Sequence, residues 1–400
     1  MRVAVTIAIL LVIAAGVARV LLGRAHPSSV RAANAAGDAA CLSCHQEQAA
    51  FEQTAHRLTS RLPTRENLMG SFRAGENVLR TANPLLHFRM DSAADGFYQT
   101  AVMGRGRDTT VRAERIAYVT GSRKGQSFLY WHDDRLYQLP VSYWAALGWA
   151  NSPAYPDGRA NFDRQIPPRC LECHATWFES VPDSHAVNRY RAATALLGLS
   201  CETCHAAGKT HVSRARSVLH AMLPPAIVNP ARLSRQRQLD ACALCHGGTE
   251  PLRSAPFAFV PGQALEKKFV LGTAPDTDRV DVHGNQVALL ERSQCFRRSQ
   301  MTCATCHDVH REQRDVAAFS GRCLGCHTVQ SCGLFPTHGD ALREKCVDCH
   351  MPALPSSGIV ANRVGGAFHV NVRTHWIKVY PESKPPAGSD SLQAVRPSRS

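Results

Sequence analysis

The chain opens with an apolar segment behind a single basic residue. Arg2 precedes the run Val3–Ala18, and small residues follow it. This arrangement is typical of a secretory signal peptide. Arg19 keeps the run shorter than a comfortable membrane span, although a slightly longer stretch could remain uncleaved as an anchor. We therefore expect residues 1–25 to be a signal peptide or an N-terminal anchor, and the protein to be exported to the periplasm.

Short apolar and aromatic runs separated by polar turns follow in residues 85–145. Tyr98–Met103 is one such run. Phe128–Trp131 and Arg135–Pro140 flank three polar residues, which is the pattern of a β-hairpin. We expect a small antiparallel sheet around 95–145 that packs against the rest of the protein, or serves as a docking surface or lid.

A different pattern, C-x-x-C-H, recurs seven times and uses 14 of the 16 cysteines. The copies are Cys41/Cys44/His45, Cys170/Cys173/His174, Cys201/Cys204/His205, Cys242/Cys245/His246, Cys303/Cys306/His307, Cys323/Cys326/His327 and Cys346/Cys349/His350. Cys295 and Cys332 remain. A disulfide between them is an open alternative in an oxidising compartment.

The C-x-x-C-H pattern is the attachment signature of c-type haem. Each cysteine bonds to one vinyl group of the porphyrin, and the adjacent histidine ligates the iron. Zinc also uses C-x-x-C pairs, but it requires no histidine directly after the second cysteine. All seven pairs have one here, although only 19 of 400 residues are His. We therefore expect seven covalently attached haem c groups, each with its motif histidine on the iron.

The net charge of +14 and the pI near 9.3 first suggest a nucleic-acid or membrane surface as partner. Each haem carries two propionates, so seven haems bring negative charges equal in number to this excess. The Lys and Arg excess is therefore explained by propionate compensation, and we expect no nucleic-acid partner.

Two histidines early in the chain are candidates for the second axial ligand of an iron. His56 lies on a helix-like run, eleven residues after His45. His211 follows the motif at 201–205 beyond a glycine, which lets the chain turn away and offer this side chain to a neighbouring haem. A surface position is the alternative for each.

Two later histidines are also candidates. His310 lies only three residues after His307, too close to reach the opposite face of the same ring, so we expect it to ligate a different haem. His375 lies after the last motif and can return to complete a site. The weaker candidates are His87, His132, His185, His220, His283, His338 and His369.

Three stretches carry a resemblance to a known group. Cys201–His211, Met301–His310 and Cys346–Pro352 resemble the multihaem cytochromes of the cytochrome c-554 type, whose superfamily also contains octahaem hydroxylamine oxidoreductase and pentahaem nitrite reductase. The likeness covers about 170–380. It implies a mostly α fold with stacked haems and two histidines on each iron, and it supports the three distal candidates that follow position 200.

The enzymes of this superfamily differ from the chain in their motifs. The nitrite-reducing relatives use a catalytic haem whose motif ends in Lys, whereas all seven motifs here end in His. The hydroxylamine-oxidising relatives carry eight haems and a cross-linked tyrosine that spacing alone does not assign here. The resemblance therefore favours an electron carrier over an enzyme.

We expect a mostly α fold with extensive loops and a haem-stacked core, plus the small antiparallel β insert. The expected divisions are a signal peptide or anchor at 1–25, a linker at 26–38, an N-terminal region with one haem and the hairpin at 39–165, a haem-dense domain with six haems at 166–380 and a flexible tail at 381–400.

The expected function is electron transfer through mostly bis-His, low-spin haems, because two strong ligands keep the iron geometry constant between redox states. The alternative is a multihaem oxidoreductase acting on a small nitrogen or sulfur species at one open-site haem. The expected partners are redox proteins, such as a membrane quinol oxidoreductase or other cytochromes.

Overall fold

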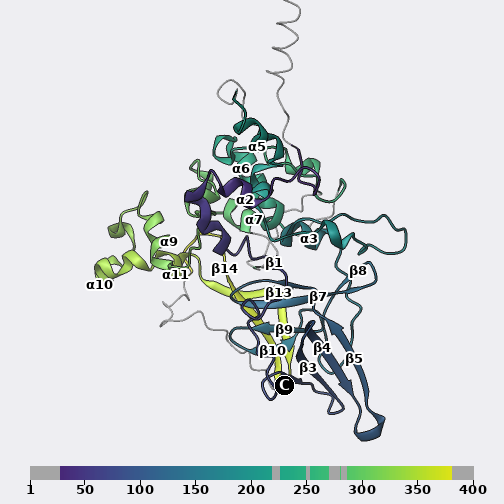
Figure 1. The fold of residues 1–400 in the computed structure, drawn as a ribbon. Helices are drawn as coiled ribbons and strands as arrows, with labels where there is room; N and C mark the ends of the chain where they lie inside the picture. Colours follow the sequence, from purple (N-terminus) through teal and green to yellow (C-terminus); the bar gives the residue numbers. More distant parts are fainter. Residues whose placement is uncertain (1–27, 219–225, 249–252, 270–279, 281–285, 381–400) are drawn as a thin grey trace, which may run out of the picture.

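The computed structural model describes residues 28–218, 226–248, 253–269, 280 and 286–380. The expected signal peptide, the expected tail and the weaker candidates His220 and His283 lie outside the described residues. Short helices gather at one end of the molecule and antiparallel sheets at the other (Figure 1).

The larger sheet is antiparallel, curled and eight-stranded. Seven strands follow the order β1-β6-β7-β9-β10-β13-β14, and β8 pairs with β7. They are β1 (Ser60–Arg61), β6 (Tyr118–Thr120), β7 (Gly125–His132), β8 (Arg135–Gln138), β9 (Val141–Trp144), β10 (Gly148–Asn151), β13 (Ala353–Arg363) and β14 (Gly366–Arg373). Asn151 of β10 pairs with Asn362 of β13, so the C-terminal hairpin completes a sheet begun in the first half of the chain.

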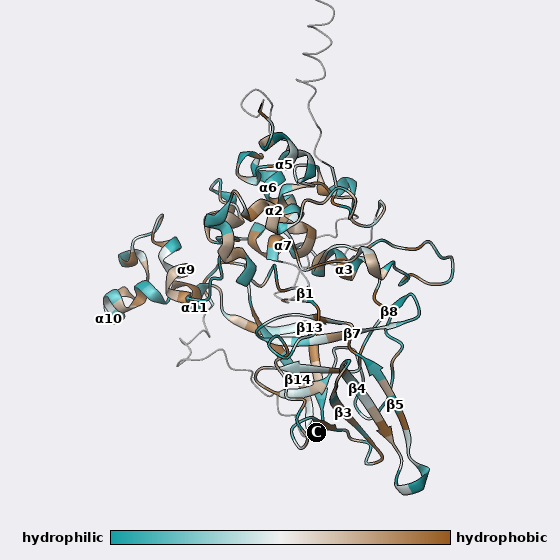
Figure 2. Cartoon of the chain, in the orientation of Figure 1, coloured by the Kyte–Doolittle hydropathy of each residue, from teal (hydrophilic) through white to brown (hydrophobic). Residues whose placement is uncertain are grey.

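A four-stranded antiparallel sheet shares its core with the larger one. Its strands, in sheet order, are β2 (Val78–Arg80), β3 (Leu86–Ala93), β4 (Gly96–Met103) and β5 (Thr110–Arg115). One apolar cluster combines Phe88 and Met90 of β3 with Phe128 and Val141 of the larger sheet, all fully buried. The buried Gln99 side chain ties the sheets together by donating to the Val141 carbonyl at 2.7 Å and accepting from its amide at 3.1 Å. The turn between β4 and β5 is hydrophilic and projects away from the helices (Figure 2).

The β-hairpin predicted around the polar turn is present. Strands β7 and β8 pair with His132 opposite Arg135, which leaves a two-residue turn. Asp133 in this turn has a φ of 54°, a left-handed conformation that Asp tolerates and that tight hairpin turns require.

The prediction of a mostly α fold is wrong. The structure is only 29% helical and 25% strand, and its sheets extend far beyond the insert expected at 95–145. The hairpin β13–β14 lies after the last motif, in a region expected to be haem-bound and helical. Phe368, Val370 and Val372 alternate there with polar residues, which is the period of a strand and not of a helix.

The helices are short, and four of them end at the histidine of a motif. The described helices are α2 (Asp38–Leu42), α3 (Pro168–His174), α4 (Cys201–His205), α5 (Lys209–Ala215), α6 (Arg235–His246), α7 (Gln286–Glu291), α8 (Gln294–Arg297), α9 (Val316–Cys323), α10 (Phe335–His338) and α11 (Cys346–His350). Local sequence explains their starts: the Ser200 side chain accepts from the Glu202 amide, and Ser234 accepts from Arg237. Two strands, β11 (Ala175–Trp177) and β12 (Leu196–Leu197), form a small third sheet among them.

Among the helices that the structure describes, none combines the length and the apolar character needed to cross a membrane.

Candidate haem-binding sites

Each C-x-x-C-H motif forms one turn of helix. In the motifs at 41–45, 303–307 and 323–327 the histidine amide donates to the carbonyl of the first cysteine at 2.9 Å. Residues three and four apart lie on the same face of such a turn, so both thiols and the imidazole can reach one ligand. This geometry suits the two thioether bonds and the iron bond of a haem c.

Several motif histidines have one ring nitrogen held by the backbone. Nδ1 of His205 lies 2.9 Å from the Val228 carbonyl, and Nδ1 of His350 lies 2.9 Å from the Lys378 carbonyl. A proton on Nδ1 that is donated to a carbonyl leaves the lone pair on Nε2, which is the arrangement that metal-ligating histidines use.

Three motif histidines face a histidine from outside their motif. The ring centres are 6.1 Å apart for His246 and His56, 6.2 Å for His205 and His310, and 6.3 Å for His307 and His375. Two imidazoles that each bond one first-row metal ion through a nitrogen at about 2 Å, from opposite sides, have ring centres about 6 Å apart. The residues present therefore fit an iron between each pair of rings.

Three of the four favoured distal candidates are placed by these pairs. His310 faces His205 and not its near neighbour His307. His375 returns from beyond the last motif to face His307. The sequence does not specify which motif each candidate meets, because these partners come together only through the tertiary fold.

Burial favours the neutral form of His246 and of His375. It lowers the pKa of His246 to about 4, with a smaller contribution from His56. It also lowers the pKa of His375 to about 4, with His307 adding to the effect. A neutral imidazole has the lone pair that a metal requires.

The fourth favoured candidate, His211, lies in α5 near the first motif. Burial lowers its pKa, and the neighbouring His45 lowers it further. The structure thus places His211 near His45, the histidine of a motif other than the one that precedes it.

The weaker candidates occupy varied positions. His87 lies in β3, His132 ends β7, and His185 is exposed in a loop. Nδ1 of His338 contacts the neighbouring Thr337 hydroxyl. His369 in β14 has its Nδ1 2.9 Å from the Ser356 carbonyl, the same pattern as the motif histidines.

Motif cysteines from distant parts of the chain contact one another. In three pairs, Cys41 with Cys201, Cys173 with Cys245 and Cys242 with Cys303, each thiol is the main cause of the shifted pKa of the other, so the two sulfur atoms of each pair lie close together. Five of the seven motifs are therefore in side-chain contact with another motif.

Four of the predicted attachment cysteines are exposed in the structure: Cys44, Cys170, Cys204 and Cys326. Among the described residues, Cys44 and Cys326 belong to none of the three thiol pairs. The Cys44 thiol lies 3.9 Å from the hydroxyl of its neighbour Ser43. Each is the second cysteine of its motif, on a short turn at the surface of the protein. The bonding of Cys44 and Cys326 to haem stays a prediction, as it does for the other motif cysteines.

The two cysteines outside the motifs lie beside different motifs and are not joined to each other in the structure. Burial is the main cause of the raised pKa of Cys306, and Cys295 adds to it. Burial likewise raises the pKa of Cys346, with a contribution from Cys332.

Three motifs carry a buried acid between their cysteines, a feature that sequence reasoning does not single out. Glu172 accepts from the Phe257 amide at 2.7 Å and lies 3.6 Å from Arg169. Asp348 pairs with Arg373 of β14 at 2.7 Å. Glu202 accepts from three backbone amides.

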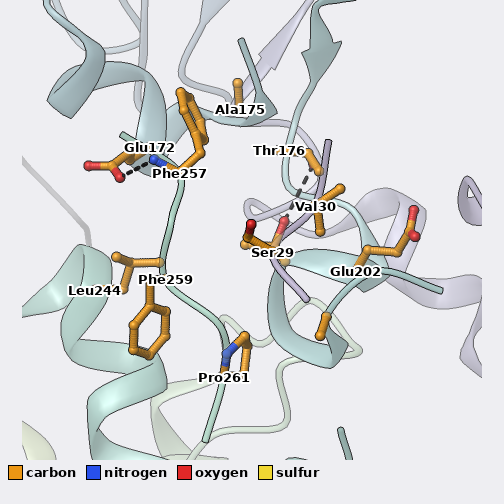
Figure 3. A pocket seen from close by; sticks show the side chains of 12 residues that line it. Ser29, Val30, Glu172, Ala175, Thr176, Glu202, Leu244, Phe257, Phe259 and Pro261 are labelled. Carbon is orange, nitrogen blue, oxygen red and sulfur yellow. Dashed lines mark hydrogen bonds between the residues drawn. The ribbon is translucent and has the colours of Figure 1, made fainter. Parts of the chain in front are cut away.

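A small cavity lies where α3, α4 and α6 meet the segment that precedes the first motif (Figure 3). Glu172 and Glu202 line it from opposite sides, and Ser29 and Val30 close part of it. Its volume of about 30 Å³ holds one or two waters, which is too little for a substrate.

Comparison with a known protein family agrees with this geometry. The model of a family described as cytochrome c554 and c-prime matches residues 152–206, which include the motifs at 170–174 and 201–205. No curated protein matches the chain. A solved structure, the undecaheme cytochrome from the S-layer of Carboxydothermus ferrireducens, is similar at 18% identity with a TM-score of 0.41; the match covers 88% of this chain and 53% of that one. The chain thus spans about half the length of the solved structure it matches.

Proposed function

We propose that this multihaem c-type cytochrome is an exported heptahaem electron carrier whose irons are held mainly by pairs of histidines. The observation that carries the proposal is the set of three histidine pairs with ring centres 6.1–6.3 Å apart. When bound, haem supplies one-electron chemistry at an iron whose geometry changes little if both axial positions hold strong ligands. With haem bound, the two histidines of each pair would both bond the iron and would exclude a substrate from it.

The residue assignments follow from the pairs. His246 and His56 hold the iron of the haem on Cys242 and Cys245. His205 and His310 hold that of the 201–205 motif, and His307 and His375 that of the 303–307 motif.

The remaining four motifs complete the proposed count of seven. His45 and His211 serve the first motif, which the contribution of His45 to the lowered pKa of His211 supports. His174, His327 and His350 are the proximal ligands of the other three.

Contacts between motifs support transfer along the chain of sites. The sulfur atoms of Cys173 and Cys245 lie close together, and so do those of Cys242 and Cys303. The motif at 242–246 therefore has a neighbour on either side. Electrons that enter the row of haems from a redox protein at one end can leave it at the other end. The proposed partners are membrane quinol oxidoreductases or other cytochromes.

Export is proposed from the N-terminal segment together with the chemistry of the motifs. Covalent haem c is assembled outside the cytoplasm, so a secretory signal at residues 1–25 and seven attachment motifs are mutually consistent. The periplasm is the proposed compartment. In the alternative, residues 1–25 stay uncleaved and anchor the protein to the membrane.

Stopped-flow absorption spectroscopy tests the carrier function. The holoprotein, reduced with dithionite, is mixed with an oxidised soluble cytochrome or with nitrite or hydroxylamine, and the haem bands are followed. A carrier reoxidises with the cytochrome in repeated cycles and is inert to the small molecules. Rapid reoxidation by nitrite with loss of nitrite would replace the carrier proposal with the oxidoreductase.

A further inference from the structure

Glu202 occupies an unusual position for a carboxylate. It lies inside the motif Cys201-Glu-Thr-Cys204-His205 and is only 1% exposed. Its Oε1 accepts from the amides of Ala36 at 2.9 Å and Gly208 at 2.6 Å, and its Oε2 accepts from Gly37 at 3.1 Å. Among the described residues, this side chain accepts three hydrogen bonds and donates none, which suits an ionised carboxylate.

Two of these amides mark the starts of two helices. Gly37 precedes α2, which leads into Cys41 and His45. Gly208 precedes α5, which carries His211. One side chain therefore joins the chain segments that present the two histidines assigned to a single iron.

Further contacts join the 201–205 motif, which contains Glu202, to the first motif. The Asp38 carboxylate accepts from the Cys201 amide at 2.9 Å and pairs with Arg57 at 3.1 Å. The sulfur atoms of Cys41 and Cys201 lie close together. The negative charge of Glu202 acts on the Cys41 thiol, so it lies within electrostatic reach of both motifs.

We propose that Glu202 is a positioning residue that fixes His45 and His211 relative to each other and places a buried negative charge beside the haems of the 41–45 and 201–205 motifs. The inference rests on the proposed ligand pairs. A buried negative charge stabilises the more positive oxidised haem, and it acts strongly where water is excluded, so both reduction potentials are lowered.

The residues around Glu202 also hold the N-terminal segment in place. The Ala207 amide donates to Ser28 O, and the Lys209 amide donates to Asn34 O. Val30 is buried against this region. Residues 28–37, expected as part of a linker, therefore pack on the helix that bears Glu202. Loss of the Glu202 hydrogen bonds should let this segment detach, so its detachment can be used to detect that loss.

The test compares Glu202→Gln and Glu202→Asp with the wild-type holoprotein by spectroelectrochemical titration and EPR. Gln removes the charge and replaces one acceptor oxygen with a donor, so two haems should titrate at higher potential while the other five are unchanged. Asp retains the charge but is one methylene shorter, so the potentials should stay near wild type while the low-spin signal of one haem broadens. Glu172→Gln is the matched control, because it removes a buried motif carboxylate beside a different haem.

Tryptic cleavage after the exposed Arg31 gives a second readout that is independent of the haems. Glu202→Gln should accelerate this cleavage, while cleavage after the exposed Arg107 in the β4–β5 turn should not change. Unchanged potentials and unchanged cleavage in Glu202→Gln, or a shift shared equally by all seven haems, would overturn the inference. A nitrite-reactive haem in the wild-type protein would instead count against the carrier function, so the two failures are distinguishable.

Discussion

His205 and His310 face each other with ring centres 6.2 Å apart and planes inclined by 25°, although His310 follows His307 by only three residues. His307 faces His375 at 6.3 Å. One short loop therefore presents two histidines to two different partners. Because the loop cannot move one of them freely without moving the other, it fixes two iron sites relative to each other.

Removing His310 tests this arrangement. In His310→Ala the haem on Cys201 and Cys204 loses its distal ligand and becomes high-spin, while the haem beside His307 keeps His375 and stays low-spin. EPR of the oxidised holoprotein should show one high-spin haem.

The double variant His310→Ala/His375→Ala shows whether the two histidines bind two different irons or the same one. The two histidines serve different irons in the ligand assignment, so the double variant should show two high-spin haems. A single high-spin haem in the double variant would mean that both residues act at the same iron, contrary to the assigned pairs.

Ser293 holds the segment that carries His375. Its fully buried hydroxyl donates to the His375 carbonyl at 3.2 Å and accepts from the Ile377 amide at 2.8 Å. Ser293→Ala leaves the partly buried Ile377 amide unpaired, so we expect a loss of about 1–2 kcal/mol of unfolding free energy. We also expect a broadened EPR signal from the iron site of His307, which Ser331→Ala, at an exposed serine, should not produce.

Arg373 connects the C-terminal hairpin to the last motif. Its guanidinium pairs with Asp348 at 2.7 Å and donates to the Met351 carbonyl at 3.2 Å. Arg373→Ala leaves the largely buried Asp348 carboxylate without its partner. Urea unfolding should therefore show a loss of about 2–3 kcal/mol of unfolding free energy. Arg343→Ala breaks an exposed pair with Asp340 and should cost less than about 1 kcal/mol. Equal losses in the two variants would mean that the hairpin does not depend on this ion pair.

Local sequence patterns predicted the features that depend on neighbouring residues. The β7–β8 hairpin follows from a polar turn between aromatic runs, and the helical turns of the motifs follow from their fixed spacing. The extent of the sheets was not predictable in this way. The pairing of Asn151 with Asn362 joins strands from opposite halves of the chain, and no local pattern specifies such a partner.

The same limit applies to the candidate sites. Spacing indicated that His310 belongs to another iron than His307, but only the tertiary fold brings it to His205. The role of Glu202 was not predictable, because the sequence shows only an acidic residue between two cysteines. The three amides that donate to it come from residues distant in the chain or beyond the motif. The alternation in β14 was present in the sequence and was outweighed by the expectation of a helical, haem-bound region.

The most direct test of the central claim is EPR of the fully oxidised holoprotein with a measured iron-to-protein ratio. The account predicts seven irons per chain and low-spin ferric signals from the paired sites. It also predicts that the perpendicular pair His56 and His246, inclined by 82°, differs in g-values from the pairs inclined by 25°. Addition of nitrite should leave these signals unchanged. A high-spin signal from a paired site that shifts with nitrite would contradict the account.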